Sequence, residues 1–172
     1  MVRILVAGGA GFIGAALCEK LLRFGHTVLC VDSLQTGSAQ TVARLRAFSG
    51  FSFIHQDIAQ QLDAGQLGLV EEIYNLACPA SPRQYQQDPV KTIETNVIGT
   101  RNLLELARLT GARFLQASTS EVYGSPKQKP QREDYWGNVN TTGPRACYDE
   151  GKRCAEALVQ AYHTQHRAVS SL

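Results

Sequence analysis

The chain has 172 residues, a nearly balanced formal charge of +2 and five cysteines. This length fits one domain with a real hydrophobic core, and the charge gives no sign of binding to nucleic acid or to an anionic membrane. No run approaches the roughly 18 apolar residues that a membrane span needs. Because the cysteine count is odd and no Cys-x-x-Cys pair occurs, we expect buried free thiols in a reducing cytoplasm, and no metal site.

The first element in chain order is an apolar run at 2–7, which predicts a buried strand. It leads into Gly8-Gly9-Ala10-Gly11-Phe12-Ile13-Gly14, which fits the pattern Gly-x-Gly-x-x-Gly. Apolar residues at helical spacing follow and end near Gly25. Glycines at these positions permit a tight turn and allow a pyrophosphate to sit on the N-terminus of the helix, where backbone N–H groups are free.

A second apolar strand, 27–31, ends at Asp32, 18 residues after Gly14. A carboxylate at this distance is placed to meet the ribose hydroxyls of adenosine. Asp32 would repel a 2′-phosphate and no arginine follows it directly, which favours NAD over NADP. The alternative is a glycine-rich turn with a solvated aspartate. The ordered series of strand, glycines, helix, strand and acid favours dinucleotide binding.

The rest of the chain continues to alternate between strands and helices. Strands are expected at 51–55, 72–76 and 113–117, and helices around 42–48, from Asp88 to Gly111, and from about 145 to His166. This alternation indicates a parallel sheet, so we predict an α/β fold, a Rossmann-like doubly wound parallel sheet. Such sheets bind ligands at the carboxyl ends of their strands, and Ser118 to Tyr123 follow one such end.

The helix that follows the polar loop at 125–144 carries Tyr148 and Lys152, which lie one helical turn apart and share a face. A phenol with a pKa near ~10 is a poor base at neutral pH, and an ammonium beside it lowers that pKa. A bound cationic nicotinamide would act in the same direction. The pair can then take a proton from a sugar hydroxyl. Alone, the spacing also fits an ordinary amphipathic helix.

Three segments carry a resemblance to a known family. They are 75–82 (Asn-Leu-Ala-Cys-Pro-Ala-Ser-Pro), 117–124 (Ala-Ser-Thr-Ser-Glu-Val-Tyr-Gly) and the block 135–153, which contains Tyr-Trp-Gly-Asn-Val-Asn. Together with the glycine turn and the Tyr-Lys pair, they make residues 1–167 resemble the extended short-chain dehydrogenases/reductases, and within that family the decarboxylases of UDP-glucuronate. Related 4,6-dehydratases usually show Thr-Asp-Glu in place of Thr-Ser-Glu, and 4-epimerases usually lack the glutamate.

The resemblance implies an NAD-dependent conversion of UDP-glucuronate into UDP-xylose through a C4-keto intermediate. Tyr148 would act as the base, with Lys152 lowering its pKa and Thr119 holding the C4 oxygen. The resulting β-keto acid loses carbon dioxide, and hydride then returns to C4. Ser120 and Glu121 are expected to position the ring and manage the C5 proton. The alternative roles are a hydroxyl that caps a turn, for Thr119 and Ser120, and a carboxylate in the first turn of a helix, for Glu121.

The same match implies a cofactor site, a substrate site and a partner. Tyr85 and Asn102 are candidates for the sugar nucleotide. The helices at 88–110 and 145–166 resemble those that form the dimer interface of the family, so we expect a homodimer. The residues expected to line NAD, besides Tyr148 and Lys152, are Gly8, Gly11, Phe12, Ile13, Gly14, Asp32, Thr36, Gly37, Asp57, Ile58, Leu76, Cys78 and Thr95.

The sequence also departs from the family pattern. Glu94 stands where many of these decarboxylases have a lysine, and Thr141-Thr142 replace an expected Pro-x. Family members continue beyond the position of Leu172 into a substrate domain. We therefore expect residues 1–172 to be an NAD-binding Rossmann domain that is incomplete at its C-terminal end, with 168–172 beginning the next strand and the substrate domain absent.

Two alternative functions stay open at this point. The first is a 4,6-dehydratase or 4-epimerase of another nucleotide sugar, which the glutamate at position 94 favours because it is more familiar in dehydratases. The second is a non-catalytic NAD-binding or dimerisation module, which would keep the Tyr-Lys pair but turn over no nucleotide sugar.

Overall fold

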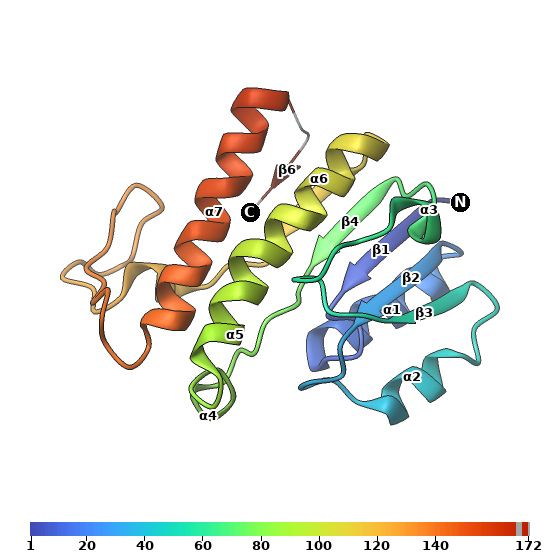
Figure 1. Cartoon of the computed structure of the whole chain (residues 1–172), viewed down its shortest axis with the longest axis horizontal. Helices are drawn as coiled ribbons and strands as arrows, with labels where there is room; N and C mark the ends of the chain where they lie inside the picture. Colours follow the sequence, from blue (N-terminus) through green and yellow to red (C-terminus); the bar gives the residue numbers. More distant parts are fainter. Residues whose placement is uncertain (168–169, 172) are drawn as a thin grey trace.

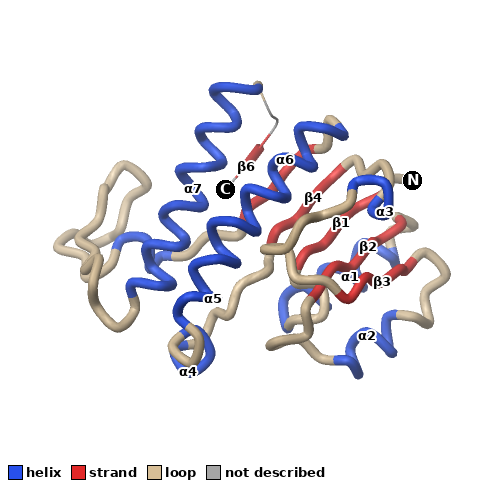
Figure 2. Tube along the Cα trace, viewed as in Figure 1, coloured by secondary structure: helices blue, strands red, loops and turns tan. Residues whose placement is uncertain are grey.

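A computed structural model, which describes residues 1–167 and 170–171, shows one sheet of parallel strands. Along the sheet the order is β3-β2-β1-β4-β5-β6 (Figures 1 and 2). The chain leaves β1 towards β2 and β3 and then returns to add β4, β5 and β6 on the other side of β1, so the predicted Rossmann-like doubly wound fold is confirmed. The strands are β1 (Arg3–Ala7), β2 (Thr27–Asp32), β3 (Phe51–His55), β4 (Glu72–Asn75), β5 (Arg113–Gln116) and β6 (Ser170–Ser171).

Helices cover both faces of this sheet (Figure 1). In β1, Ile4 and Val6 pack with the cluster formed by α1 and α2, whereas Leu5 and Ala7 pack with the cluster formed by α6 and α7. A strand that is buried on both faces needs apolar residues at every position, which is why β1 and β2 read as continuous apolar runs. The longer helices are α1 (Phe12–Arg23), α2 (Ala39–Leu45), α5 (Pro89–Glu94), α6 (Thr100–Thr110) and α7 (Ala146–His166).

The predicted helix from Asp88 to Gly111 has the expected ends. The Asp88 carboxylate accepts the backbone N–H of Lys91 (3.0 Å), and Pro89 occupies the first helical position. At the other end Gly111 has φ +72°, the left-handed conformation that closes many helices. These local signals are read directly from sequence, and they set both boundaries.

The interior of that helix differs from the prediction, because a π-helical segment, η1 (Thr95–Gly99), lies between α5 and α6. Such segments widen a helix locally and occur often at functional sites. Here Gly99 lies against Ile58, and a Cβ on this glycine would approach the Ile58 Cδ1 to 2.6 Å. The close packing of Ile58 is a tertiary contact, so helical periodicity alone does not predict the segment.

Other differences are small. Of the five strands expected between residues 2 and 117, all except 51–55 differ by one residue at one end, and α2 begins three residues before the predicted stretch. Of the predicted strand at 168–172, Ser170–Ser171 pair in parallel with β5, and positions 168, 169 and 172 lie outside the described residues. Three short helical turns were not predicted, namely α3 (Ala64–Leu67), α4 (Pro82–Tyr85) and the 3₁₀ turn η2 (Ser120–Tyr123).

A buried polar network joins β4, β5 and α6 beneath the carboxyl edge of the sheet. The Asn75 amide donates to Gln116 Oε1 (2.8 Å) and to the Thr100 hydroxyl (3.1 Å), and its oxygen accepts the N–H of Ala77 (3.2 Å). Asn75, Thr100 and Gln116 are each at most 1% exposed. Because buried polar groups must be paired, this network fixes the relative positions of the three elements.

Replacing Asn75 with alanine is expected to lower the free energy of unfolding by about 1–3 kcal/mol, because Gln116 loses its best donor in a buried site. Urea unfolding of the variant measures this loss. Gln128, which is exposed in the loop at 125–144, provides the control: Gln128→Ala is expected to change stability by less than about 0.5 kcal/mol. Equal stability of the two variants would contradict the structural role assigned to Asn75.

Candidate active site

The carboxyl ends of β1 to β5 surround a cavity of about 450 Å³. Its wall also includes the N-terminus of α1, part of η1 and the face of α7 that carries Tyr148 and Lys152. The structure therefore brings the glycine turn near the N-terminus and the pair Tyr148 and Lys152 into the wall of one cavity. Of the residues expected to line a cofactor, those on this wall are Gly8, Gly11, Phe12, Ile13, Gly14, Asp32, Thr36, Asp57, Ile58, Leu76, Cys78, Thr95, Tyr148 and Lys152.

The glycine turn forms one end of the cavity by packing backbone against backbone. Gly8 has φ +76°, and a Cβ there would lie 2.8 Å from the Ala77 Cα. A Cβ on Gly14 would lie 2.1 Å from the carbonyl oxygen of Gly8. Gly11, the N-cap of α1, makes no side-chain cap, and the first turn of α1 carries no acidic residue. The first N–H groups of this helix are therefore available to an anion in the cavity.

Asp32 connects the glycine turn to the loop after β2. Its Oδ2 accepts the N–H of Ala10 (2.9 Å) and its Oδ1 accepts the N–H of Leu34 (2.8 Å), while the residue is 8% exposed. Gly37 is not part of the cavity wall, but it packs so closely on Asp32 that a Cβ would lie 2.8 Å from Oδ1. A carboxylate offers about four acceptor positions, so Asp32 keeps capacity for a ligand hydroxyl.

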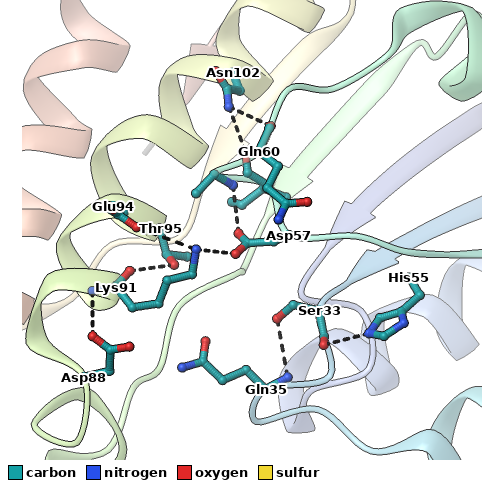
Figure 3. A network of polar contacts seen from close by, with 12 residues as sticks. Ser33, Gln35, His55, Asp57, Gln60, Asp88, Lys91, Glu94, Thr95 and Asn102 are labelled. Carbon is teal, nitrogen blue, oxygen red and sulfur yellow. Dashed lines mark hydrogen bonds and ion pairs between the residues drawn. The ribbon is translucent and has the colours of Figure 1, made fainter.

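A second carboxylate, Asp57, follows β3 and faces helix α5 (Figure 3). Its Oδ1 accepts the N–H of Ala59 (2.8 Å), and its Oδ2 forms an ion pair with Lys91 Nζ. The Lys91 ammonium also lies 3.8 Å from Glu94 Oε2. The Thr95 hydroxyl donates to the Lys91 carbonyl (2.9 Å). Asp57 therefore belongs both to the cavity wall and to a polar network that reaches across to α5.

Tyr148 and Lys152 lie side by side on the buried face of α7. They are 7% and 4% exposed, and both line the cavity. The Lys152 ammonium donates to the carbonyl of Ala117 at the end of β5 (2.9 Å). The Tyr148 ring stacks on that of Tyr85, with centroids 4.9 Å apart and planes within 9°. These contacts hold both side chains against the carboxyl edge of the sheet.

The electrostatics of the tyrosine differ from the expectation. Burial raises the pKa of Tyr148 above its ordinary value, and a hydrogen bond with Thr119 acts in the opposite direction but is smaller. Burial also lowers the pKa of Lys152, with Cys78 and Glu156 opposing this shift. The expected lowering of the tyrosine pKa by Lys152 is not found, because desolvation disfavours the phenolate and the ammonium is bound to a carbonyl.

The other three predicted catalytic residues lie beside the cavity and not on its wall. Thr119 contacts Tyr148 through the hydrogen bond named above, and its hydroxyl also accepts the N–H of Glu121 (3.2 Å). Ser120 is exposed. Glu121 forms an ion pair with Arg145, the residue that precedes α7. Thr119 is therefore the member of this triplet that the structure brings to the tyrosine.

The two candidates for substrate contacts are also off the cavity wall. Tyr85 is 2% exposed beneath Tyr148, and its hydroxyl has no hydrogen-bond partner among the described residues. The Asn102 amide donates to the carbonyls of Ile58 (2.9 Å) and Gln60 (3.0 Å), so it holds the loop after β3 (Figure 3).

Sequence reasoning missed several residues of the wall. Most lie within five residues of the end of a strand, a position that could have predicted them, whereas Gln84 comes from the short helix α4, whose start is marked by Ser81 and Pro82. The missed residues include Ser33, Gln35, Gln56, Gln84 and Ala117.

Within the described residues, 1–167 and 170–171, no group of three or more His, Cys, Asp or Glu side chains could hold a metal ion. None of the helices described there is long and apolar enough to cross a membrane.

The parallel sheet, the glycine turn and the cavity at the strand ends define a protein of the Rossmann class. Comparison with known proteins identifies the family within this class, because the profile of the NAD dependent epimerase/dehydratase family matches residues 4–171. The chain belongs to this family.

The similar curated proteins include several decarboxylases. UDP-glucuronic acid decarboxylase 1 of Arabidopsis thaliana is 51% identical over 94% of the chain, and the match covers 36% of that relative. UDP-glucuronic acid decarboxylase 1 of Danio rerio is 52% identical over 95% of the chain and 38% of its own length. The resemblance inferred from the sequence is thus confirmed, and the chain spans less than half the length of these relatives.

Similar solved structures have related activities. A dTDP-glucose 4,6-dehydratase from Streptomyces venezuelae, determined with NAD bound, has a TM-score of 0.84 and 30% identity, covering 98% of this chain and 53% of that one. A UDP-galactose 4-epimerase has a TM-score of 0.84 and 28% identity, covering 98% and 54%.

The pH at which Tyr148 ionises provides a direct test of the site electrostatics. Because burial favours the neutral phenol, half-ionisation is expected above the ordinary pH of about 10. A cationic nicotinamide in the cavity is expected to lower this pH. The measurement is the difference in phenolate absorbance between the wild type and Tyr148→Phe, with and without NAD. A value below 10 without NAD would contradict the described burial effect.

Proposed function

We propose that the chain binds NAD along the carboxyl edge of the sheet, with the pyrophosphate at the glycine turn and the nicotinamide beside Tyr148. The observation that carries this proposal is that one cavity wall contains Gly8, Gly14, Asp32, Tyr148 and Lys152 together. Asp32 would accept the adenosine ribose hydroxyls and disfavour a 2′-phosphate, which supports NAD over NADP.

The residues present fit this cofactor. The turn tolerates no Cβ at Gly8 or Gly14, so its backbone can come close to a pyrophosphate. The uncapped start of α1 offers N–H groups to the same anion. Phe12 and Ile13, which are 96% and 68% exposed, present apolar surface at the cavity that a bound dinucleotide would cover.

We further propose that the substrate is UDP-glucuronate and the product UDP-xylose, so that residues 1–172 correspond to the cofactor-binding part of a decarboxylase. The 51–52% identity to UDP-glucuronic acid decarboxylases supports this choice. The Thr119-Ser120-Glu121 triplet supports it as well, since related dehydratases usually have an aspartate at the second position.

The reaction follows from the chemistry of the side chains around Tyr148. Bound NAD would accept hydride from C4 of the sugar and return it at the end of the turnover. Tyr148 takes the proton of the C4 hydroxyl, and the Thr119 hydroxyl, already bonded to Tyr148, holds the same oxygen. In the C4-keto acid the bond between C5 and the carboxylate breaks, carbon dioxide leaves, and the electron pair moves into the C4 carbonyl. C5 then takes up a proton, a step that we assign to Ser120 and Glu121, and as hydride returns to C4, Tyr148 returns its proton to the C4 oxygen.

Lys152 supports this cycle from its place on α7. It donates to the Ala117 carbonyl and lines the cavity, so it presents positive charge beside the phenolate when that forms. We propose Ser120 and Glu121 as residues that position the ring, Glu121 acting from its ion pair with Arg145. Tyr85 and Asn102 remain proposed contacts for the sugar nucleotide.

A second candidate is a 4,6-dehydratase or 4-epimerase of another nucleotide sugar. It is supported by the 4,6-dehydratase and 4-epimerase among the similar structures and by Glu94, which is 3.8 Å from Lys91 and adds negative charge where many decarboxylases have a lysine. All three reactions begin with oxidation at C4, so release of carbon dioxide distinguishes the decarboxylase.

The first experiment is to incubate the chain with NAD and UDP-glucuronate and to follow carbon dioxide and UDP-xylose by mass spectrometry. Formation of both is expected, and Tyr148→Phe is expected to lower the rate about 10²- to 10⁴-fold because it removes the base. Tyr162→Phe, on the same helix but outside the cavity wall, is the matched control. NAD binding without any product would mean that residues 1–172 bind the cofactor but do not suffice for the reaction, and turnover without carbon dioxide would contradict the decarboxylase.

We also propose a homodimer that forms through α5, α6 and α7. Val90 and Ile93, one turn apart on α5, are 67% and 44% exposed, which leaves apolar side chains for a second copy to cover. Sedimentation velocity is expected to show a dimer, and Val90→Asp to weaken it at least about tenfold. The control is Leu69→Asp, which alters a side chain that is 80% exposed outside these helices. A monomeric wild type would contradict the proposal.

A further inference from the structure

The loop after β3 is attached to the helix formed by α5, η1 and α6 at three points. Asp57 forms its ion pair with Lys91 of α5, and the carbonyl of Ile58 accepts from Asn102 of α6. Between these two contacts the Ile58 side chain packs against Gly99 of η1. Figure 3 shows the polar contacts on either side of the loop. The loop is therefore clamped at the point where Asp57 and Ile58 enter the cavity wall.

Among these three contacts, the ion pair of Lys91 is the one made to a charged group, the carboxylate of Asp57. The side chain of Lys91 is 25% exposed and that of Asp57 is 16% exposed, so the pair is shielded from water more than a surface ion pair is. Its backbone is fixed on both sides, because its N–H is capped by Asp88 and its carbonyl accepts from Thr95. The ammonium is thus aimed at Asp57 from a rigid helix.

Asp57 lines the cavity and keeps about two acceptor positions that no described residue occupies. A carboxylate offers about four positions, and Ala59 N–H and Lys91 Nζ occupy one on each oxygen. An adenine ring presents an exocyclic amine, a donor that such a carboxylate accepts, whereas hypoxanthine presents a carbonyl at the same place. An Asp57 carboxylate held in this position would therefore favour adenine and disfavour hypoxanthine.

We propose that Lys91 is a positioning residue that makes the dinucleotide site selective for adenine by fixing the carboxylate of Asp57 towards the exocyclic amine. This inference rests on the proposed binding of NAD. The helix that carries Lys91 also packs on α7, because a Cβ on Gly151 of α7 would lie 3.1 Å from the side chain of Asn96 in η1. This helix therefore reaches from Asp57, at the proposed adenine position, to the part of the cavity that Tyr148 lines.

The test compares the affinity of the chain for NAD and for nicotinamide hypoxanthine dinucleotide by calorimetry. The wild type is expected to prefer NAD. Lys91→Met is expected to lower NAD affinity about fivefold while leaving the hypoxanthine analogue nearly unchanged, because one oriented hydrogen bond is lost. Lys91→Arg keeps the charge and is expected to retain most of the preference. Lys127→Met, an exposed lysine in the loop at 125–144, is the matched control.

The ratio of the two affinities distinguishes positioning from simple support of the fold. A loss of affinity shared equally by both dinucleotides in Lys91→Met would overturn the role in base selectivity, as would affinities that do not change at all. If Lys91→Met does not fold, as judged by its thermal unfolding, Lys91→Gln provides the same comparison with a neutral donor. A wild type that binds neither dinucleotide would overturn the proposed NAD binding itself, whereas NAD binding with an unchanged ratio would overturn the role of Lys91 alone.

Discussion

The structure depends on how closely the glycine turn approaches the backbone around it. A Cβ at Gly14 would fall 2.1 Å from the Gly8 carbonyl oxygen, and one at Gly9 would fall 2.6 Å from the Cys30 sulfur. Only glycine allows α1 to begin this close to the end of β1. The start of α1, the loop that Asp32 holds and the cavity wall all take their positions from this approach.

The second constraint is the burial of two ionisable groups on α7. Desolvation acts against charge on both Tyr148 and Lys152, so it raises one pKa and lowers the other. The structure compensates locally by giving Lys152 the Ala117 carbonyl and Tyr148 the Thr119 hydroxyl. Neither contact removes the preference of the tyrosine for its neutral form.

Much of the fold and part of the site were predictable because their signals are local. Apolar runs, helix caps and the glycine pattern gave the strands, α1 and the ends of the helix from Asp88 to Gly111. Asp32 and Asp57 could be predicted because one ends a strand and the other comes two residues after a strand, and strand ends meet at one edge of a parallel sheet.

The features that escaped prediction come from contacts between distant segments. The π-helical segment η1 exists where Ile58 packs on Gly99, and the ion pair of Lys91 with Asp57 joins elements 34 positions apart in sequence. The direction of the tyrosine pKa escaped for the same reason. Sequence shows that Lys152 is one turn away, but burial and the carbonyl that captures the ammonium belong to the tertiary structure.

The buried tyrosine also explains how a base could be active only when the cofactor is present. In the described chain burial raises the pKa of Tyr148 and so favours the neutral phenol, and the nearby ammonium is held by the Ala117 carbonyl. A cationic ring placed beside Tyr148 would add positive charge at the phenol, and because Tyr148 is buried that charge would act more strongly than it does in water. Proton abstraction at a sugar hydroxyl would then follow occupation of the cofactor site. This order would keep the chain from carrying a reactive phenolate in the absence of a hydride acceptor.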